Sequence, residues 1–389
     1  MPRKITVSCI LSALFLISVS ASGLCANMRI GGYWENWAAA INPGSGGTSD
    51  PSYYANDLQY FNLVYYSFLT LAQTPNPDNP PVAQWSGQAI YESMTAADVI
   101  TVMTVTDPSW ENPYEWQRTK IQAIIDECHA NGKKFIWAIG GWSDLTQTIS
   151  DEQIPAFVTK CVNLLKLSGD GIDFDWEHLS ADASIAAQQR RVLGKVLPAL
   201  RQALDENGLS GKLLGYTTRM NAFWNNATRP QGVTAYDSDG EGIDVGAAMT
   251  EAGSSFNDCV DWVNIMMYDI PPGDMGYPSG YTLGAYTMVL GFFQQYMNKN
   301  KVVMGFEPGG QAAGGVWEGM VVDKEVIDYV AAQGYGGIMF WAINQGALSP
   351  STEITGANAQ ELAKYASELT PVVTGVLPPA VLTLLLLDS

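Results

Sequence analysis

The stretch Gly169–His178, with the sequence GDGIDFDWEH, defines one strand of this protein. Its acidic residues Asp173, Asp175 and Glu177 are spaced two apart, and in a β-strand that spacing places all three side chains on one face. The residues between them are large and apolar and face the other way: Ile172, Phe174 and Trp176. Neighbouring carboxylates repel one another, and burying them is costly unless they are protonated or paired. The pattern therefore predicts proton-transfer chemistry at the end of a strand.

Two other interpretations of the three acids fit less well. Calcium-binding loops usually alternate acids with Asn, Gly or Ser in a turn, whereas the intervening residues here favour a strand. A solvated face is also a poor fit, because the apolar residues indicate that the other side of the strand is buried.

Strand-like and helix-like segments alternate along the rest of the chain, which favours a parallel α/β sheet. Eight strands with intervening helices predict a (β/α)8 TIM barrel, in which catalytic groups lie at the carboxyl ends of the strands. The predicted strands are near 28–34, 61–69, 134–140, 171–177, 212–218, 261–268, 301–307 and 336–342. The predicted helices are 117–130, 151–168, 181–206, 284–298, 323–333 and 357–367.

The acidic strand resembles the Asp-x-x-Asp-x-Asp-x-Glu signature of glycoside hydrolase family 18, which contains chitinases and some endo-β-N-acetylglucosaminidases. Its four acidic positions are Asp170, Asp173, Asp175 and Glu177. Other segments are similar to family strands in the expected order, and they include Met-x-Tyr-Asp at 266–269: the set is 28–34, 61–68, 266–269 and 337–341. The resemblance runs from about residue 27 to the mid-360s and implies one catalytic barrel over 27–368.

The resemblance implies a retaining, substrate-assisted reaction, in which the 2-acetamido oxygen of the sugar attacks the anomeric carbon. Glu177 is then the proton donor, and its pKa must be raised by desolvation and a neighbouring anion. Asp175 is implied to bind the acetamide N–H and to stabilise the oxazolinium intermediate. Asp173 lies deeper and is expected to share a proton with Asp175, while the Tyr268 hydroxyl holds the acetamide carbonyl oxygen.

The remaining predicted substrate-binding residues are Asp269, Trp341, Tyr33, Phe68, Met266 and Arg219. By resemblance, Asp269 helps to fix the sugar and Trp341 forms the floor beneath it. Tyr33 and Phe68 either line the same pocket or belong to the barrel core, and Arg219 either contacts substrate or pairs with an acid. The first acid of the signature, Asp170, is out of phase with the others, so we expect it to stabilise the start of the strand.

The chain departs from the family pattern at several places. Ala138 stands where the third strand usually carries Ser, and the loss of that hydrogen bond to the deep Asp is expected to change the pKa of the cluster. Glu307 follows the seventh strand and is expected to alter sugar contacts. Only about 28 residues separate strands seven and eight, too few for the α+β domain that many chitinases carry there. The Pro-rich segment 71–112 is interpreted as an insertion above the active face.

The composition restricts the possible partners. With 39 acidic and 20 basic residues the net charge is −19, which argues against nucleic acid, anionic substrates and anionic membrane surfaces. A neutral polymer such as chitin, or an N-acetylglucosamine oligosaccharide, is compatible with this charge. The chain has only His129 and His178, and no His/Cys cluster with zinc spacing, so we expect no cofactor and no catalytic metal.

The two ends of the chain differ from the barrel. Residues 1–26 read as a secretory signal, with two basic residues before a short apolar run, so we expect a secreted (extracellular or periplasmic) monomer without a stable membrane span. Residues 369–389 form an apolar, Pro-broken tail of unknown role. Three of the five cysteines lie outside residues 1–26: Cys128, Cys161 and Cys259. For these three, the sequence fits buried free thiols at least as well as a disulfide.

These observations predict a secreted chitinase that cleaves β-1,4 links between N-acetylglucosamine units. An endo-β-N-acetylglucosaminidase acting on N-glycans shares the mechanism and stays an alternative. A non-catalytic, lectin-like chitin-binding protein is the third interpretation, and the presence of Glu177 argues against it.

Overall fold

The computed structural model describes residues 28–69, 115–142, 149–177, 182–225, 227–228, 240–270 and 281–369. The expected signal at 1–26, the expected insertion at 71–112 and His178 lie outside the described residues, as does the tail beyond residue 369.

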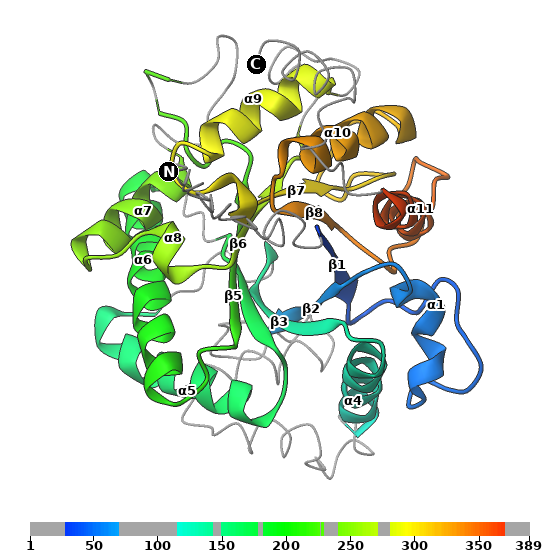
Figure 1. Cartoon of the computed structure of the whole chain (residues 1–389), viewed down its shortest axis with the longest axis horizontal. Helices are drawn as coiled ribbons and strands as arrows, with labels where there is room; N and C mark the ends of the chain where they lie inside the picture. The colour runs from blue at the N-terminus through cyan, green and yellow to red at the C-terminus, as the bar shows by residue number, and fades with distance from the viewer. Residues whose placement is uncertain are drawn as a thin grey trace, which may run out of the picture.

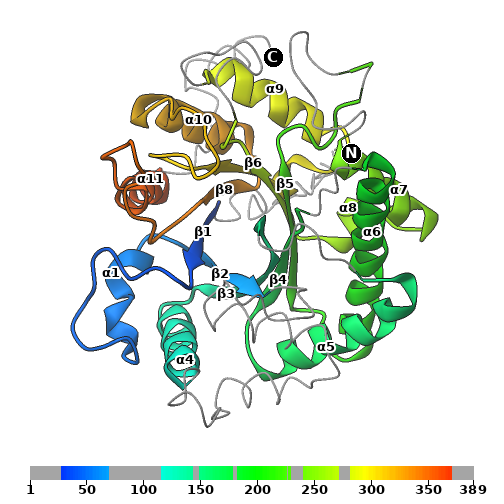
Figure 2. The ribbon, with the colours of Figure 1, turned by 180° about the vertical axis from the view of Figure 1, so that it is seen from behind.

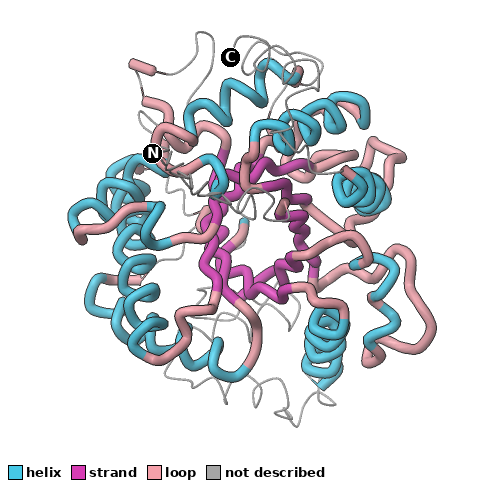
Figure 3. The backbone as a smooth tube through the Cα atoms, viewed as in Figure 1, coloured by secondary structure: helices cyan, strands magenta, loops and turns pink. Residues whose placement is uncertain are grey.

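Eight parallel strands pair in chain order and close into a barrel, which confirms the predicted fold. Figure 3 shows these strands as a ring in the middle of the molecule with the helices around its outside. The last pairing joins the eighth strand back to the first, with Arg29 opposite Gly337. The strands are β1 (Arg29–Glu35), β2 (Leu63–Leu69), β3 (Lys134–Gly140), β4 (Gly171–Asp175), β5 (Leu213–Arg219), β6 (Trp262–Met266), β7 (Val302–Phe306) and β8 (Gly337–Phe340).

The helices pack on the outer face of this ring, and Figures 1 and 2 show α5, α6 and α7 along one side and α10 and α11 along the other. The longer ones are α4 (Glu115–Ala130), α5 (Ile154–Leu167), α6 (Ala183–Glu206), α7 (Glu241–Glu251), α9 (Leu283–Phe293), α10 (Met320–Gln333) and α11 (Thr355–Glu368). The short ones are α1 (Ala55–Leu58) and α8 (Phe256–Cys259), with single turns of 3-10 helix at Pro51–Tyr53, Asp151–Gln153 and Lys299–Lys301.

Some predicted boundaries were wrong. The helix expected at 284–298 ends at Phe293, and α7 was not predicted. Its sequence EGIDVGAAMTE is short and contains two glycines, so it lacks the long apolar period that identifies a helix. The strands expected to reach residues 177 and 268 end at Asp175 and Met266. Several candidate site residues therefore lie just beyond strand ends.

The alternation along β4 separates two cores. Ile172 and Phe174 belong to the large apolar layer between strands and helices, while Asp173 and Asp175 face the barrel interior. The interior contains a second, smaller apolar cluster that includes Tyr33, Phe68, Trp262, Met266 and Tyr268. The strand pattern predicted from sequence is thus the pattern that points the carboxylates inward.

Helix α5 shows how local sequence features begin and end a helix. The Ser150 backbone N–H donates to the Gln153 side chain at 2.7 Å, which supports the start of this helical segment. The helix ends at Leu167, and Gly169 follows with a φ of 81°, a left-handed conformation that glycine adopts without strain. This reversal leads the chain directly into β4.

Between β7 and β8 the described chain contains loops and one helix, α10, as the short spacing predicted.

Cys128, Cys161 and Cys259 are buried free thiols. Within the described ranges, no helix has the length and apolar character needed to cross a membrane.

Candidate active site

The candidate residues gather at one rim of the barrel. Because all strands run parallel, their carboxyl ends lie together, and this end holds the active site in TIM-barrel enzymes. Arg219 ends β5 and Met266 ends β6, and the other rim residues follow strand ends by one to three positions. They are Glu177 after β4, Tyr268 and Asp269 after β6, Glu307 after β7 and Trp341 after β8.

Asp173 lies deepest in the barrel and is fully buried. Its Oδ2 accepts hydrogen bonds from the Tyr33 hydroxyl at 2.6 Å and the Thr217 hydroxyl at 2.7 Å. Its Oδ1 accepts from Trp262 Nε1 at 2.8 Å, with Asn264 Nδ2 at 3.5 Å. Burial raises the pKa of Asp173 and these donors oppose the rise. The site therefore surrounds this carboxylate with donors from three other strands.

The hydrogen bonds of Asp173 bear on two expectations. No described side chain of β3 donates to Asp173, and Ala138 only lies opposite it in the backbone register. The hydroxyl donors to Asp173 are Tyr33 and Thr217, and the effect of losing the Ser on the pKa of the cluster stays a prediction. No hydrogen bond joins the Asp173 and Asp175 carboxyls among the described residues, but the charge of Asp173 raises the pKa of Asp175. The sharing of a proton between the two acids stays a prediction.

Asp175 is 3% exposed, and its Oδ1 accepts no hydrogen bond from the described residues. Burial raises its pKa well above the usual range, and the charges of Glu177 and Asp173 add to the effect. The backbone of Asp175 is held closely, since Gly141 donates its N–H to the Asp175 carbonyl at 2.7 Å. A Cβ on Gly140 would lie 1.9 Å from that same carbonyl oxygen, so the close approach of the third strand requires glycine.

Glu177 lies beside Arg219, whose guanidinium nitrogen is 3.0 Å from the Glu177 carboxylate. Burial raises the pKa of Glu177 to about 7, although Arg219 pulls it down. Glu241 and Asp269 raise the Glu177 pKa further. A carboxyl with this pKa is partly protonated near neutrality and can act as a general acid.

Tyr268 and Asp269 are adjacent in sequence but reach the same site. Asp269 has a φ of 56°, a left-handed conformation that is uncommon outside glycine, and it supplies the bend that the two side chains need. Burial raises the pKa of the Tyr268 hydroxyl well above 10, and the next causes are the charges of Asp175 and Glu307. That electrostatic coupling places Tyr268 among the rim carboxylates.

Aromatic rings line another part of the rim. Trp341 stacks on Phe68 with ring centroids 5.6 Å apart and an interplanar angle of 14°. Trp37 is 54% exposed and lies 6.3 Å from both rings. Tyr33 lies below them, fully buried, with its centroid 5.4 Å from Trp341. Flat rings of this kind suit the C–H face of a sugar, with Trp341 and Trp37 the more accessible.

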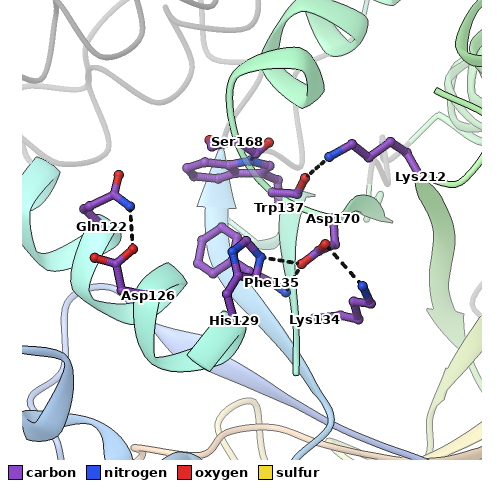
Figure 4. Close-up of polar contacts among 10 residues, drawn as sticks. Gln122, Asp126, His129, Lys134, Phe135, Trp137, Ser168, Asp170 and Lys212 are labelled. Atoms are coloured by element: carbon purple, nitrogen blue, oxygen red, sulfur yellow. Dashed lines mark hydrogen bonds and ion pairs between the residues drawn. The ribbon is translucent and has the colours of Figure 1, made fainter. Parts of the chain in front are cut away.

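Asp170 lies at the opposite end of β4 and serves the fold, as its position in the signature suggested. Its Oδ2 accepts the Phe135 backbone N–H at 2.9 Å and contacts His129 Nε2 at 2.9 Å, while Lys134 lies 3.4 Å from Oδ1 (Figure 4). These partners hold the pKa of Asp170 below its usual value, against the effect of its burial. Asp170 thereby fastens the start of β4 to α4 and β3.

The structure adds residues that the motifs did not select: Thr217, Trp262, Asn264, Glu241 and Trp37. Thr217 lies two positions before Arg219 on β5, and Trp262, Asn264 and Met266 are likewise spaced two apart on β6. The same period of two that identified the acids therefore marks these side chains as inward-facing. Glu241 had no such signal, because it begins a helix that was not predicted.

A family model for glycosyl hydrolases family 18 matches residues 29–320. The chain belongs to this family. No curated protein matches it. Family membership makes it a glycoside hydrolase by descent, and its barrel and acidic strand are those expected from the resemblance.

Solved structures of chitinases share the fold. A Streptomyces coelicolor protein described as a chitinase A is 16% identical with a TM-score of 0.54, covering 88% of this chain and 99% of that one. A class V chitinase from Nicotiana tobaccum in complex with NAG4 is 12% identical with a TM-score of 0.50, covering 87% and 98%. Chitinase ChiW from Paenibacillus is 15% identical with a TM-score of 0.52, covering 90% of this chain, which spans only 43% of that multi-modular enzyme.

Proposed function

We propose that this family 18 glycoside hydrolase is a chitinase that cleaves β-1,4 links between N-acetylglucosamine units with retention, by the substrate-assisted route. The observation that carries the proposal is the pairing of two different carboxyls at the rim. Glu177 has a pKa raised to about 7, and Asp175 has a buried oxygen that accepts no hydrogen bond from the described residues. One suits a proton donor and the other suits an acceptor for an amide N–H.

The proposed steps use these groups in order. Protonated Glu177 gives its proton to the glycosidic oxygen as that bond breaks. The acetamide carbonyl oxygen of the same sugar attacks the anomeric carbon, which gives an oxazolinium ion and a free alcohol. Asp175 accepts the acetamide N–H and stabilises the positive charge. Water then gives a proton to Glu177 and attacks the anomeric carbon. This opens the oxazolinium ring and returns Glu177 to its protonated form.

Tyr268 and Trp341 complete the proposed site. The Tyr268 side chain is buried, and the charge of Asp175 raises its pKa, which supports our assignment of the Tyr268 hydroxyl as the group that holds the acetamide oxygen in line for attack. Trp341, stacked on Phe68, offers a flat apolar surface for the pyranose ring. Asp269, Met266, Tyr33 and Arg219 stay predicted contributors to binding or support.

The test compares an N-acetylglucosamine oligomer with a high-mannose glycoprotein as substrates. We expect cleavage of the oligomer, a first-formed product with the β configuration, and little action on the glycoprotein. A Glu177→Gln variant should lose activity by about 10³-fold or more, because it cannot donate a proton. The matched control is Asp170→Asn, an acid of the same signature at the other end of β4, which should keep its activity.

The outcomes separate the alternatives. Preferred release of the glycan from the glycoprotein would favour an endo-β-N-acetylglucosaminidase, and oligomer binding without turnover by the parent protein would favour a lectin-like role. Comparable turnover by the Glu177→Gln variant would remove Glu177 from its role.

We also propose that the protein is exported and acts as a monomer. The signal-like residues 1–26 support export. Mass spectrometry of the protein from its native host should find a mature chain that starts near residue 27, and a retained Met1 would contradict export. Light scattering should give the mass of one chain.

A further inference from the structure

Glu307 is a buried acid beside the candidate site that the proposed reaction does not use. It is 2% exposed and follows β7 directly. Its two carboxyl oxygens accept the Ala312 backbone N–H at 3.1 and 3.2 Å, and Gln345 Nε2 donates to Oε1 at 3.1 Å. Its remaining hydrogen-bond partner is another acid, the Asp269 carboxyl. Two carboxyls can share a hydrogen bond only when one of them carries a proton.

The surroundings decide which acid carries that proton. Burial, followed by the charge of Asp269, raises the pKa of Glu307 to about 9. Burial also raises the pKa of Asp269, but this acid is less buried, and its hydrogen bonds with the Ala313 backbone N–H at 2.7 Å and with Glu307, together with the charge of Arg219, oppose the rise. In this pair Glu307 is therefore the donor and Asp269 the acceptor.

A second connection fixes the backbone of Asp269 to the same segment. The Asp269 N–H donates to Gln311 Oε1 at 2.9 Å, and Gln311 Nε2 donates to the Glu307 carbonyl at 2.6 Å. Residues 307–313 thus hold Asp269 by its backbone and by its side chain, in the left-handed conformation that directs it to the rim. The Glu307–Asp269 pair is therefore held in place by several hydrogen bonds from one segment of the chain.

The charged and titratable groups around the pair come from several elements. On the side of the rim, Asp269 is coupled to Glu177 and Arg219. The charges of both Glu307 and Asp269 raise the pKa of Tyr268, which precedes Asp269 in the chain. On the other side, Glu307 and Tyr268 line a small cavity together with Glu318 and Asp323, which form a separate carboxyl pair.

We propose that Glu307 is a positioning residue that acts as a neutral acid: it donates a hydrogen bond to Asp269, keeps Asp269 ionised and turned toward the substrate, and limits the pair to one negative charge. This inference rests on the proposed function for its kinetic consequences but not for the pairing itself. It gives Glu307 a role through Asp269, and this is the route by which we infer that Glu307 alters sugar contacts.

The kinetic test uses three variants and an N-acetylglucosamine oligomer. Glu307→Gln keeps a donor for Asp269 and should retain kcat within about threefold, whereas Glu307→Leu removes the donor and should lose about 10- to 100-fold in kcat. The acid limb of kcat/KM should move to higher pH only in Glu307→Leu, because Asp269 without its donor protonates more readily. Glu318→Gln, in the neighbouring pair, should leave the profile unchanged.

Two results would overturn the proposal. Equal losses in Glu307→Gln and Glu307→Leu would show that the charge of Glu307 matters, and an unchanged profile in Glu307→Leu would show that no positioning occurs.

A spectroscopic test does not depend on activity. Infrared difference spectra at pH 7 between the parent protein and Glu307→Gln should contain a protonated carboxyl band, which disappears as the pH rises through about 9. Asp269→Asn should displace this band, and Glu318→Gln should not. If the band is present but the parent protein cleaves no oligomer, the pairing stands and the proposed function fails. If the parent protein lacks the band at pH 7, the inference about Glu307 is wrong.

Discussion

The Arg219 guanidinium contacts the Glu177 carboxylate at 3.0 Å, and both side chains are largely buried, at 12% and 11% exposure. The two largest influences on the pKa of Glu177 are opposed: burial raises it to about 7 and Arg219 lowers it. The protonation of the proposed proton donor is therefore set mainly by a balance between desolvation and one ion pair.

Replacing Arg219 should shift that balance. In Arg219→Met the favourable charge is lost, so Glu177 should hold its proton to higher pH and the basic limb of kcat/KM should move upward. In the parent protein that limb should fall through about pH 7, because activity needs protonated Glu177. Arg201→Met removes a pair with Asp261 outside the rim and serves as control. A basic limb that does not move would contradict the assignment of Glu177.

Asp175→Asn tests the coupling between the two rim carboxyls. The charge of Glu177 raises the pKa of Asp175, so the pair ionises in two steps, and the variant should leave one ionisation, that of Glu177 at about pH 7, in the basic limb of kcat/KM. It also removes the charge that stabilises the oxazolinium ion, and kcat should fall by about 10²-fold with a smaller change in KM. A fall confined to KM would mean that Asp175 only binds substrate.

Thr217→Val tests the support beneath the site. Thr217 donates to Asp173 at 2.7 Å and accepts from Asn264 at 2.9 Å, so an isosteric replacement leaves buried groups unsatisfied. The free energy of unfolding should fall by about 1–3 kcal/mol in denaturant titrations near neutral pH. Thr250→Val, on an exposed helix turn, should cost less.

The loss in Thr217→Val should depend on pH. Burial raises the pKa of Asp173 above its unfolded value, so this group favours folding below its unfolded pKa, and that contribution is lost as pH rises through the folded pKa. Removing a donor to the carboxylate should therefore matter more at neutral than at acidic pH. The same loss at both would argue that Asp173 stays protonated.

The short connection between β7 and β8 makes a prediction about product sizes. The described chain there contains loops and α10, with no added domain to form a wall beside the rim. We therefore expect internal cutting of a soluble chitin derivative, with a rapid fall in viscosity for few new reducing ends. Slow shortening of the polymer with steady release of dimer would contradict this.

The sequence predicted the parts of the site that lie on one strand. A period of two along β4 places Asp173 and Asp175 on the inward face, because side chains of an extended chain alternate whatever packs around them, and Glu177 follows two residues beyond the end of the strand. The same reasoning predicted eight strands to within a few residues, since each is a short apolar run between helical segments. These are local properties, and local sequence is enough to specify them.

The partners of those acids depend on distant segments. Asp173 receives donors from β1, β5 and β6, and Asp269 shares a proton with Glu307 from a different strand end. No spacing in the chain encodes these meetings, because barrel closure and register decide which residues share a layer. The bend at Asp269 is likewise fixed by Gln311 and Ala313, which lie 42 and 44 residues further along.

The sequence by itself determined which acids could do chemistry and at which end of the barrel they lie. Only the tertiary structure decided their protonation, because pKa values follow from burial and from charges and donors that folding brings within a few ångströms.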